Sequence, residues 1–249
     1  MAKIDIPTKR LIQLRPEDWV KAILMEEDLV IAEMDPEKNP KVESRLDSLF
    51  WVESKEGRII LNIEPQGYYE SSLPARMLRY RSDVWEYTMS KGMGIPSIKQ
   101  VVIFFYPYHD NRQHILEDKR EDNSSIYFSY DVIKIWEMEK DYIIENELIG
   151  LYSLLPLMKV KKYETPDEII EETVKAIETI EDGVLKGDIL AAMSILSSEK
   201  YSSELVKKYV RREMLMNSPL FEEWVREERE EATINAKRDS IIEILIERF

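Results

Sequence analysis

Residues 58–66 read RIILNIEPQ, an apolar run that ends in Glu64, Pro65 and Gln66. Because side chains alternate between the two faces of a β-strand, Glu64 and Gln66 share one face if the strand continues through Pro65. Glu and Gln are rarely buried without partners, and proline cannot donate a hydrogen bond to a sheet. The end of this predicted strand is therefore a candidate for chemistry rather than for packing.

A second carboxylate comes from the preceding strand. The stretch 43–52, ESRLDSLFWV, predicts that strand, and the SKEG shortly after it predicts a tight turn. If Ser54 pairs with Gly57 across the turn, the same register places Asp47 opposite Glu64, with their Cβ atoms about 5 Å apart. A bulge at Gly57 would shift this pairing by one residue.

Two facing carboxylates repel each other unless one is protonated or a cation lies between them. A hard divalent cation such as Mg²⁺, or Mn²⁺, binds carboxylates, backbone carbonyls and water, so Asp47, Glu64 and the backbone carbonyl of Pro65 are candidate ligands. Gln66 is placed to hold a water molecule by hydrogen bonding. A metal-bound water is a better nucleophile at neutral pH, and the metal stabilises charge that develops on a phosphate.

The following helix adds two further candidates, Arg76 and Tyr80, which lie four residues apart and so share a helix face. If that face looks at the site, Arg76 is expected to bind a phosphate through two hydrogen bonds and Tyr80 to hydrogen-bond nearby. The alternative is a structural bond that ties the helix to the sheet. Glu17 is a further acidic candidate, and His109 and His114 are predicted to be solvent-exposed in a polar loop.

These residues together resemble the PD-(D/E)XK nuclease superfamily, and in particular its recombination-promoting (Rpn-like), transposase-associated branch. The resemblance consists of an Asp on one strand, Glu-x-Gln at the end of the next, and a helix that carries Arg-Met-Leu-x-Tyr. It covers roughly residues 10–160 through short motifs. The matching segments are 45–47, 61–66 and 73–80, with 125–138 and 145–159 similar to the downstream pattern.

The resemblance implies a restriction-endonuclease-like mixed β-sheet flanked by helices. It also implies metal-dependent cleavage of DNA phosphodiesters, with Asp47 and Glu64 as metal ligands and Gln66 in place of the lysine of the superfamily name. Pro65 departs from the family pattern, in which an apolar residue with a free N–H is more usual.

The order of predicted elements is that of an α/β fold with a mixed sheet. We expect a nuclease core over residues 1–160 and an all-helical region over residues 161–249. The long last helix, 221–249, ends in an aliphatic cluster and predicts a partner-facing or coiled-coil tail, such as a homodimer contact. The predicted elements are a helix from Pro16, strands over 28–34, 98–107 and 125–138, a helix over 71–90, a polar loop over 108–123, and helices over 145–158 and from Thr165.

The composition limits the possible functions. The 249 residues include no cysteine, which excludes thiolate metal sites, and carry a net charge of −14. An acidic chain is unsuited to non-specific nucleic-acid binding but leaves room for a local basic groove or for metal ions that supply positive charge. No secretory signal or membrane-spanning stretch is present in the sequence, so a cytoplasmic protein is predicted.

The interpretation that follows is a Mg²⁺-dependent DNA endonuclease. Two alternatives remain open. One is a catalytically inactive relative that keeps the fold as a binding module. The other is an interaction protein that acts through its C-terminal helices.

Overall fold

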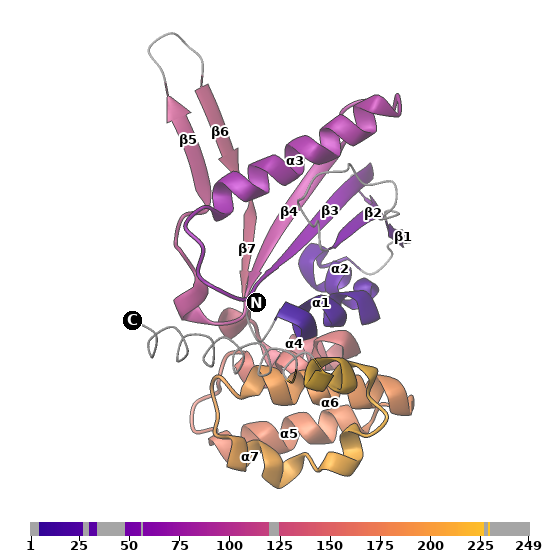
Figure 1. Ribbon diagram of the computed structural model, residues 1–249, viewed down its shortest axis with the longest axis vertical. Coiled ribbons are helices and arrows are strands. Elements are labelled where there is room, and N and C mark those ends of the chain that lie inside the picture. Colours follow the sequence, from indigo (N-terminus) through magenta and orange to yellow (C-terminus); the bar gives the residue numbers. More distant parts are fainter. Residues whose placement is uncertain are drawn as a thin grey trace, which may run out of the picture.

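The computed structural model describes residues 5–26, 30–33, 48–55, 57–119, 125–226 and 229. Within these residues the chain forms a five-stranded sheet in the order β1-β2-β3-β4-β7 (Figure 1). The first three strands pair antiparallel, whereas β3, β4 and β7 pair parallel. The predicted α/β class with a mixed sheet is thus confirmed. The strands are β1 (Val30–Glu33), β2 (Leu49–Ser54), β3 (Gly57–Gln66), β4 (Ser97–Phe104) and β7 (Asp131–Lys134).

The register of the β2–β3 hairpin is the predicted one. Ser54 pairs with Gly57, and the pairing runs without a shift along both strands. It extends one step further, because the N–H of Ile63 donates to the carbonyl of Ser48 at 2.9 Å. Asp47, the residue before Ser48, lies outside the described residues, so its predicted position opposite Glu64 remains a prediction.

Pro65 is accommodated in β3 because its nitrogen faces away from β4. The backbone N–H groups of a strand in the middle of a sheet point alternately to its two neighbours. Since the N–H of Ile63 points to β2, the nitrogen of Pro65, two residues on, points to the same side. The parallel pairing continues past Pro65 to Gln66, which lies opposite Phe104. The proline therefore removes no hydrogen bond from the β3–β4 ladder.

The side chains of β3 divide between two packing layers. Leu61 and Ile63 belong to the largest hydrophobic cluster, which also contains Trp19 of α2. Ile60 packs on the other face with Val84 of α3. Helix α3 thus crosses one face of the sheet, while α1 and α2 lie on the other (Figure 1). These helices are α1 (Asp5–Leu14), α2 (Pro16–Leu24) and α3 (Leu73–Ser90); the last two were predicted from the sequence, and the first was not.

The predicted strand over 125–138 is wrong as a single element. The chain instead forms β6 (Ser125–Ser129), then β7, then a short 3₁₀ helix, η3 (Ile135–Glu137). Tyr130 separates the two strands: it is buried, and its hydroxyl donates to the carbonyl of Gln113 at 2.9 Å. The strands on either side of Tyr130 therefore join different sheets.

The predicted loop over 108–123 is also partly wrong, because it contains β5 (Ile115–Lys119). β5 pairs antiparallel with β6 in a separate two-stranded sheet, which projects beyond the main sheet (Figure 1). A strand this exposed lacks the apolar alternation by which strands are predicted. The 3₁₀ helix η2 (Pro107–His109) precedes it.

The elements described after β7 are helices. The segment predicted to be helical over 145–158 contains a 3₁₀ helix, η4, whose residues from Gly150 to Leu157 are all buried. At α5 the predicted start at Thr165 is confirmed, with a capping box between Thr165 and Glu168. The elements are α4 (Lys140–Glu145), η4 (Ile149–Leu157), α5 (Pro166–Glu178), α6 (Gly183–Ser197), α7 (Ser203–Tyr209), η5 (Arg212–Leu215) and a helix over 219–226.

One hydrophobic cluster joins the sheet to these helices. It includes Leu11 of α1, Ile63 of β3, Leu154 of η4 and Leu190 of α6. The predicted division of the chain at residue 160 into two regions stays a prediction. No helix in the described ranges has the length and apolar character that crossing a membrane requires.

A buried carboxylate holds η4 against α2. Asp18 is 3% exposed, and its Oδ2 accepts the backbone N–H of Gly150 at 2.7 Å. Arg15 Nε donates to the same oxygen at 3.2 Å. A Cβ at residue 150 would lie 2.6 Å from the Cβ of Arg15, which is closer than packed carbon atoms allow. Glycine at 150 therefore permits the close approach of α2 and η4.

We expect Gly150→Ala to lower the free energy of unfolding by roughly 1–3 kcal/mol, as overpacking of a well-packed core does. Urea denaturation of the two proteins measures the difference. Gly183→Ala is the matched control, because a Cβ there meets nothing within 4 Å. It is expected to leave stability unchanged or to raise it by up to about 1 kcal/mol. Equal destabilisation by both substitutions would contradict the role assigned to Gly150.

Candidate active site

The end of β3 presents two polar side chains to α3. Because β3 continues through Pro65, Glu64 and Gln66 share the face that α3 covers. Both are buried, with exposures of 1% for Glu64 and 0% for Gln66. A buried carboxylate costs free energy unless a cation or hydrogen bonds compensate it, so its partners define the site.

Arg76, in the first turn of α3, supplies that compensation. Its Nη1 donates to Glu64 Oε1 at 2.7 Å, and its Nη2 donates to Gln66 Oε1 at 2.6 Å. The planar guanidinium thus bridges two side chains that lie two residues apart on the strand. The other end of the Gln66 amide is also held, since its Nε2 donates to the carbonyl of Tyr68 at 2.5 Å.

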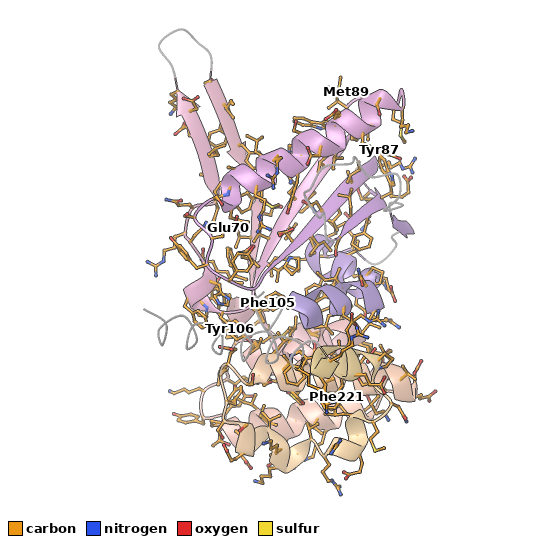
Figure 2. The ribbon with its side chains drawn as sticks, in the orientation of Figure 1. Glu70, Tyr87, Met89, Phe105, Tyr106 and Phe221 are labelled. Carbon is orange, nitrogen blue, oxygen red and sulfur yellow. The ribbon has the colours of Figure 1, made fainter. Side chains whose placement is uncertain are left out.

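Two further groups surround the guanidinium. Glu70, in the loop between β3 and α3, places Oε2 2.9 Å from Arg76 Nη2. The hydroxyl of Tyr80 lies 3.4 Å from Arg76 Nη1, one helical turn along α3. Figure 2 shows Glu70 beside the start of α3, near the foot of the β5–β6 hairpin. Carboxylate, carboxamide and phenol oxygens therefore gather around a single cation.

The charges of this cluster keep Arg76 protonated. Burial lowers the pKa of Arg76, but the neighbouring Glu64, Tyr80, Glu70 and Tyr68 raise it, and the net effect is a pKa above the ordinary value. The pKa of Tyr68 is also raised, chiefly by burial, although Arg76 acts in the opposite direction. At neutral pH the site therefore contains one fixed cation between the side chains of two acidic residues.

The site lies at the carboxyl ends of the parallel strands. Gln66 pairs with Phe104, and Phe104 pairs with Lys134, so β3, β4 and β7 end in one row. The loop after β4 is fastened to both ends of this row: Asn111 Nδ2 donates to the carbonyl of Glu70 at 2.6 Å, and Asp110 Oδ2 lies 3.2 Å from Lys134 Nζ. Open α/β sheets bind ligands outside this edge.

Asp110 organises the loop after β4. Its Oδ1 accepts the backbone N–H of Arg112 and contacts His114 Nε2, both at 2.8 Å. Burial raises the pKa of Asp110, but the bonds from Arg112, His114 and Lys134 outweigh this and hold the pKa below its ordinary value. The expectation that His109 and His114 are solvent-exposed is wrong, since both are partly buried.

The structure brings four predicted residues together and separates one. Glu64, Gln66, Arg76 and Tyr80 form one cluster. Glu17 lies on α2, across the sheet from α3, where its Oε1 is 2.8 Å from Arg15 Nε. For Arg76, the sequence left open a structural bond that ties the helix to the sheet. This bond is present, because Arg76 of α3 donates to two side chains of β3.

Two residues of the site, Tyr68 and Glu70, are not predicted from the sequence. Both lie in the connection between β3 and α3, GYYESS, which has no periodic pattern. The connection returns over the end of β3 and so brings Glu70 into contact with Arg76. Proximity of a carboxylate to the Glu-x-Gln motif in the sequence is the one signal that was present.

The oxygen atoms of the site are of the types that bind hard cations, and Arg76 contacts each of the residues that carry them. Carboxylate and amide oxygens are the ligands that Mg²⁺ and Mn²⁺ take, and Glu64, Gln66 and Glu70 provide them. In the described ranges, no group of three or more His, Asp or Glu side chains is placed to hold a metal ion. Asp47, the predicted second metal ligand, is outside those ranges. Comparison of the chain with protein-family models, curated proteins and solved structures found no match.

We expect Arg76→Ala to lower the free energy of unfolding by roughly 3–5 kcal/mol, because it leaves the buried Glu64 without its cation. Adding Glu64→Gln to this variant removes the charge and should recover part of the loss. Arg79→Ala is the control on the same helix, since Arg79 is exposed; its effect should stay within about 0.5 kcal/mol. Chemical denaturation of the four proteins measures the loss of stability and its partial recovery. Similar losses in Arg76→Ala and Arg79→Ala would rule out a stabilising ion pair.

Proposed function

We propose that the chain is a metal-dependent DNA endonuclease of the PD-(D/E)XK type, from the branch associated with transposition and recombination. Its restriction-endonuclease-like core spans residues 1–160, and an all-helical region spans 161–249. The observation that carries the proposal is the cluster of Glu64, Gln66 and Arg76 at the end of β3. The motif requires these groups to converge, although they come from a strand and from the following helix.

The proposed roles follow from the chemistry of each group. Asp47, Glu64 and the backbone carbonyl of Pro65 would hold Mg²⁺ or Mn²⁺. The carbonyl of Pro65 faces the β2 side of β3, as its nitrogen does, and Asp47 directly precedes the described part of that neighbouring segment. A bound divalent ion supplies an activated water and stabilises negative charge on phosphate oxygens.

Gln66 is a positioning residue for water in this proposal. Its amide is oriented at both ends, by Arg76 on the oxygen and by the carbonyl of Tyr68 on the nitrogen. An oriented amide adds no charge, so it can hold a water molecule beside a carboxylate without further repulsion. The lysine of the superfamily name would instead add a second cation beside Arg76.

Arg76 is the proposed phosphate-binding group. Arg76 now donates to one carboxylate oxygen, of Glu64, and to one amide oxygen, of Gln66, and two oxygens of a phosphate match the same pair of guanidinium donors. An exchange from Glu64 to phosphate leaves Glu64 in need of another cation, which divalent-ion binding would provide. Tyr80 Oη, 3.4 Å from Nη1, keeps the guanidinium over the site during such an exchange.

We expect Asp47→Ala and Glu64→Ala each to abolish Mg²⁺-dependent nicking of supercoiled plasmid DNA. Glu64→Gln should do the same while preserving a hydrogen bond to Arg76. Glu53→Ala, at an exposed carboxylate of β2, is the control that should cleave like the unaltered chain. Circular dichroism of each variant checks folding. Undiminished cleavage by Asp47→Ala or Glu64→Gln would refute the assignment.

A second candidate function is a catalytically inactive binding module with the same fold. The observation that favours it is the ion pair itself: Arg76 already offsets the charge of Glu64, as a structural bond would. In this case the guanidinium stays in place of a metal ion, and the cluster ties α3 to the sheet.

Metal titration separates the two functions. For an active site we expect Mn²⁺ to raise the unfolding temperature, with a stabilisation of about 2.7 kcal/mol at one hundred times the dissociation constant. Asp47→Ala should lose this response, and Glu53→Ala should retain it. Differential scanning fluorimetry over a range of Mn²⁺ and Mg²⁺ concentrations gives the measurement. An unaltered chain that shows no response to either ion would favour the inactive module.

A further inference from the structure

A groove lies in the helical half of the molecule, between α6, α7, η5 and the helix over 219–226. Its volume is about 320 Å³, at the small end of the range of roughly 300–1,000 Å³ for ligand pockets, so it suits a few aliphatic side chains. Figure 2 shows Phe221, one of its residues, well separated from Glu70 of the candidate active site. The apolar lining includes Ile195, Val206, Val210, Leu215, Phe221 and Trp224.

The polar features of the groove indicate what would fill it. Trp224 carries a buried indole N–H that has no acceptor within the part of the chain that the structure describes. Two exposed cations, Lys207 and Arg212, also line the groove. The expected occupant is therefore aliphatic, with acidic groups at its side.

The segment 241–249, IIEILIERF, has this composition. Read as a helix, it places Ile242, Leu245, Ile246 and Phe249 at positions i, i+3, i+4 and i+7, the spacing by which amphipathic helices anchor in grooves. Glu243 and Glu247 are four residues apart and so lie together on one flank of this stripe. Their charges are complementary to those of Lys207 and Arg212.

The length of chain between the groove and the segment 241–249 indicates that the segment comes from a second copy and not from the same molecule. Phe221 and Trp224 line the groove, whereas Ile241 follows Arg226 by fifteen residues, about 22 Å along a helix. If residues 227–240 continue the helix over 219–226, the segment would have to reverse direction within them to enter its own groove. That stretch, EEREEATINAKRDS, contains no Gly or Pro to form such a turn. A neighbouring copy meets no such restriction.

We propose that this groove is an interface between copies of the chain, filled by residues 241–249 of a second molecule. The exchange is reciprocal in a two-fold dimer, so each molecule both offers a segment and receives one. The proposal does not rest on nuclease activity, because the groove and the Glu64 cluster share no residues.

Oligomeric state tests the interface. Light scattering after size exclusion should give twice the chain mass of 29.5 kDa, and Leu245→Asp should reduce it to the single chain mass. Tyr163→Asp is the control, since Tyr163 is a highly exposed aromatic residue outside the groove; it should leave the dimer intact. A single-chain mass for the unaltered protein would overturn the proposal, as would an intact dimer in Leu245→Asp.

Cysteine cross-linking identifies the occupant, and the absence of native cysteine makes it unambiguous. Ser203 lines the groove, and Ser240 directly precedes the segment. A mixture of Ser203→Cys and Ser240→Cys chains should form a disulfide-linked pair under mild oxidation. A mixture of Ser90→Cys and Ser240→Cys chains, with Ser90 at the far end of α3, should form far less.

The double variant, Ser203→Cys with Ser240→Cys in one chain, tests the competing arrangement. We expect linked dimers on non-reducing gels. A single chain closed on itself, with no dimer, would show that the segment fills its own groove and would overturn the proposal. Equal linking of the Ser203 and Ser90 mixtures would also overturn it.

Discussion

The arrangement of the sheet and α3 depends on the buried charge of Glu64. This carboxylate lies on the central strand under a helix, where water cannot solvate it, so a cation must accompany it. Arg76 provides that cation and at the same time contacts Gln66 and Glu70. One side chain thereby links the first turn of α3 to the end of β3 and to the loop between them.

A second arginine of α3, Arg81, also bonds the helix to the sheet, further along the helix. Arg81 Nε donates to Gln100 Oε1 at 2.8 Å, and Gln100 Nε2 donates in turn to Asn62 Oδ1 at 3.2 Å. Asn62 is on the same face of β3 as Glu64. This second set is neutral apart from Arg81 and has no carboxylate, which distinguishes a structural network from the cluster at the strand end. Only the latter lies at the edge where parallel sheets bind ligands.

The molecule has two separate candidate surfaces with opposite chemistry. The Glu64 cluster is charged and buried beneath α3. The groove beside Trp224 is apolar and suits an aliphatic segment. Because a common hydrophobic cluster connects the sheet to the helical half, the groove is held on the same packed scaffold as the site. An assembly formed through the groove would contain two copies of the Glu64 cluster.

Local sequence determined much of this structure: the β2–β3 register, α3, the start of α5 and the shared face of Glu64 and Gln66. These features follow from short-range rules of alternation, turns and capping, so a single chain segment contains the necessary information. Tertiary structure decided the rest. One apolar run is divided at Tyr130 between two sheets, and the hydroxyl of Tyr130 bonds to Gln113, seventeen residues away. Glu70 joins the site because α3 docks on β3, and Glu64 pairs with Arg76 because its carboxylate is buried there. The spacing of residues in the sequence predicts neither contact, since both depend on where the folded chain excludes water.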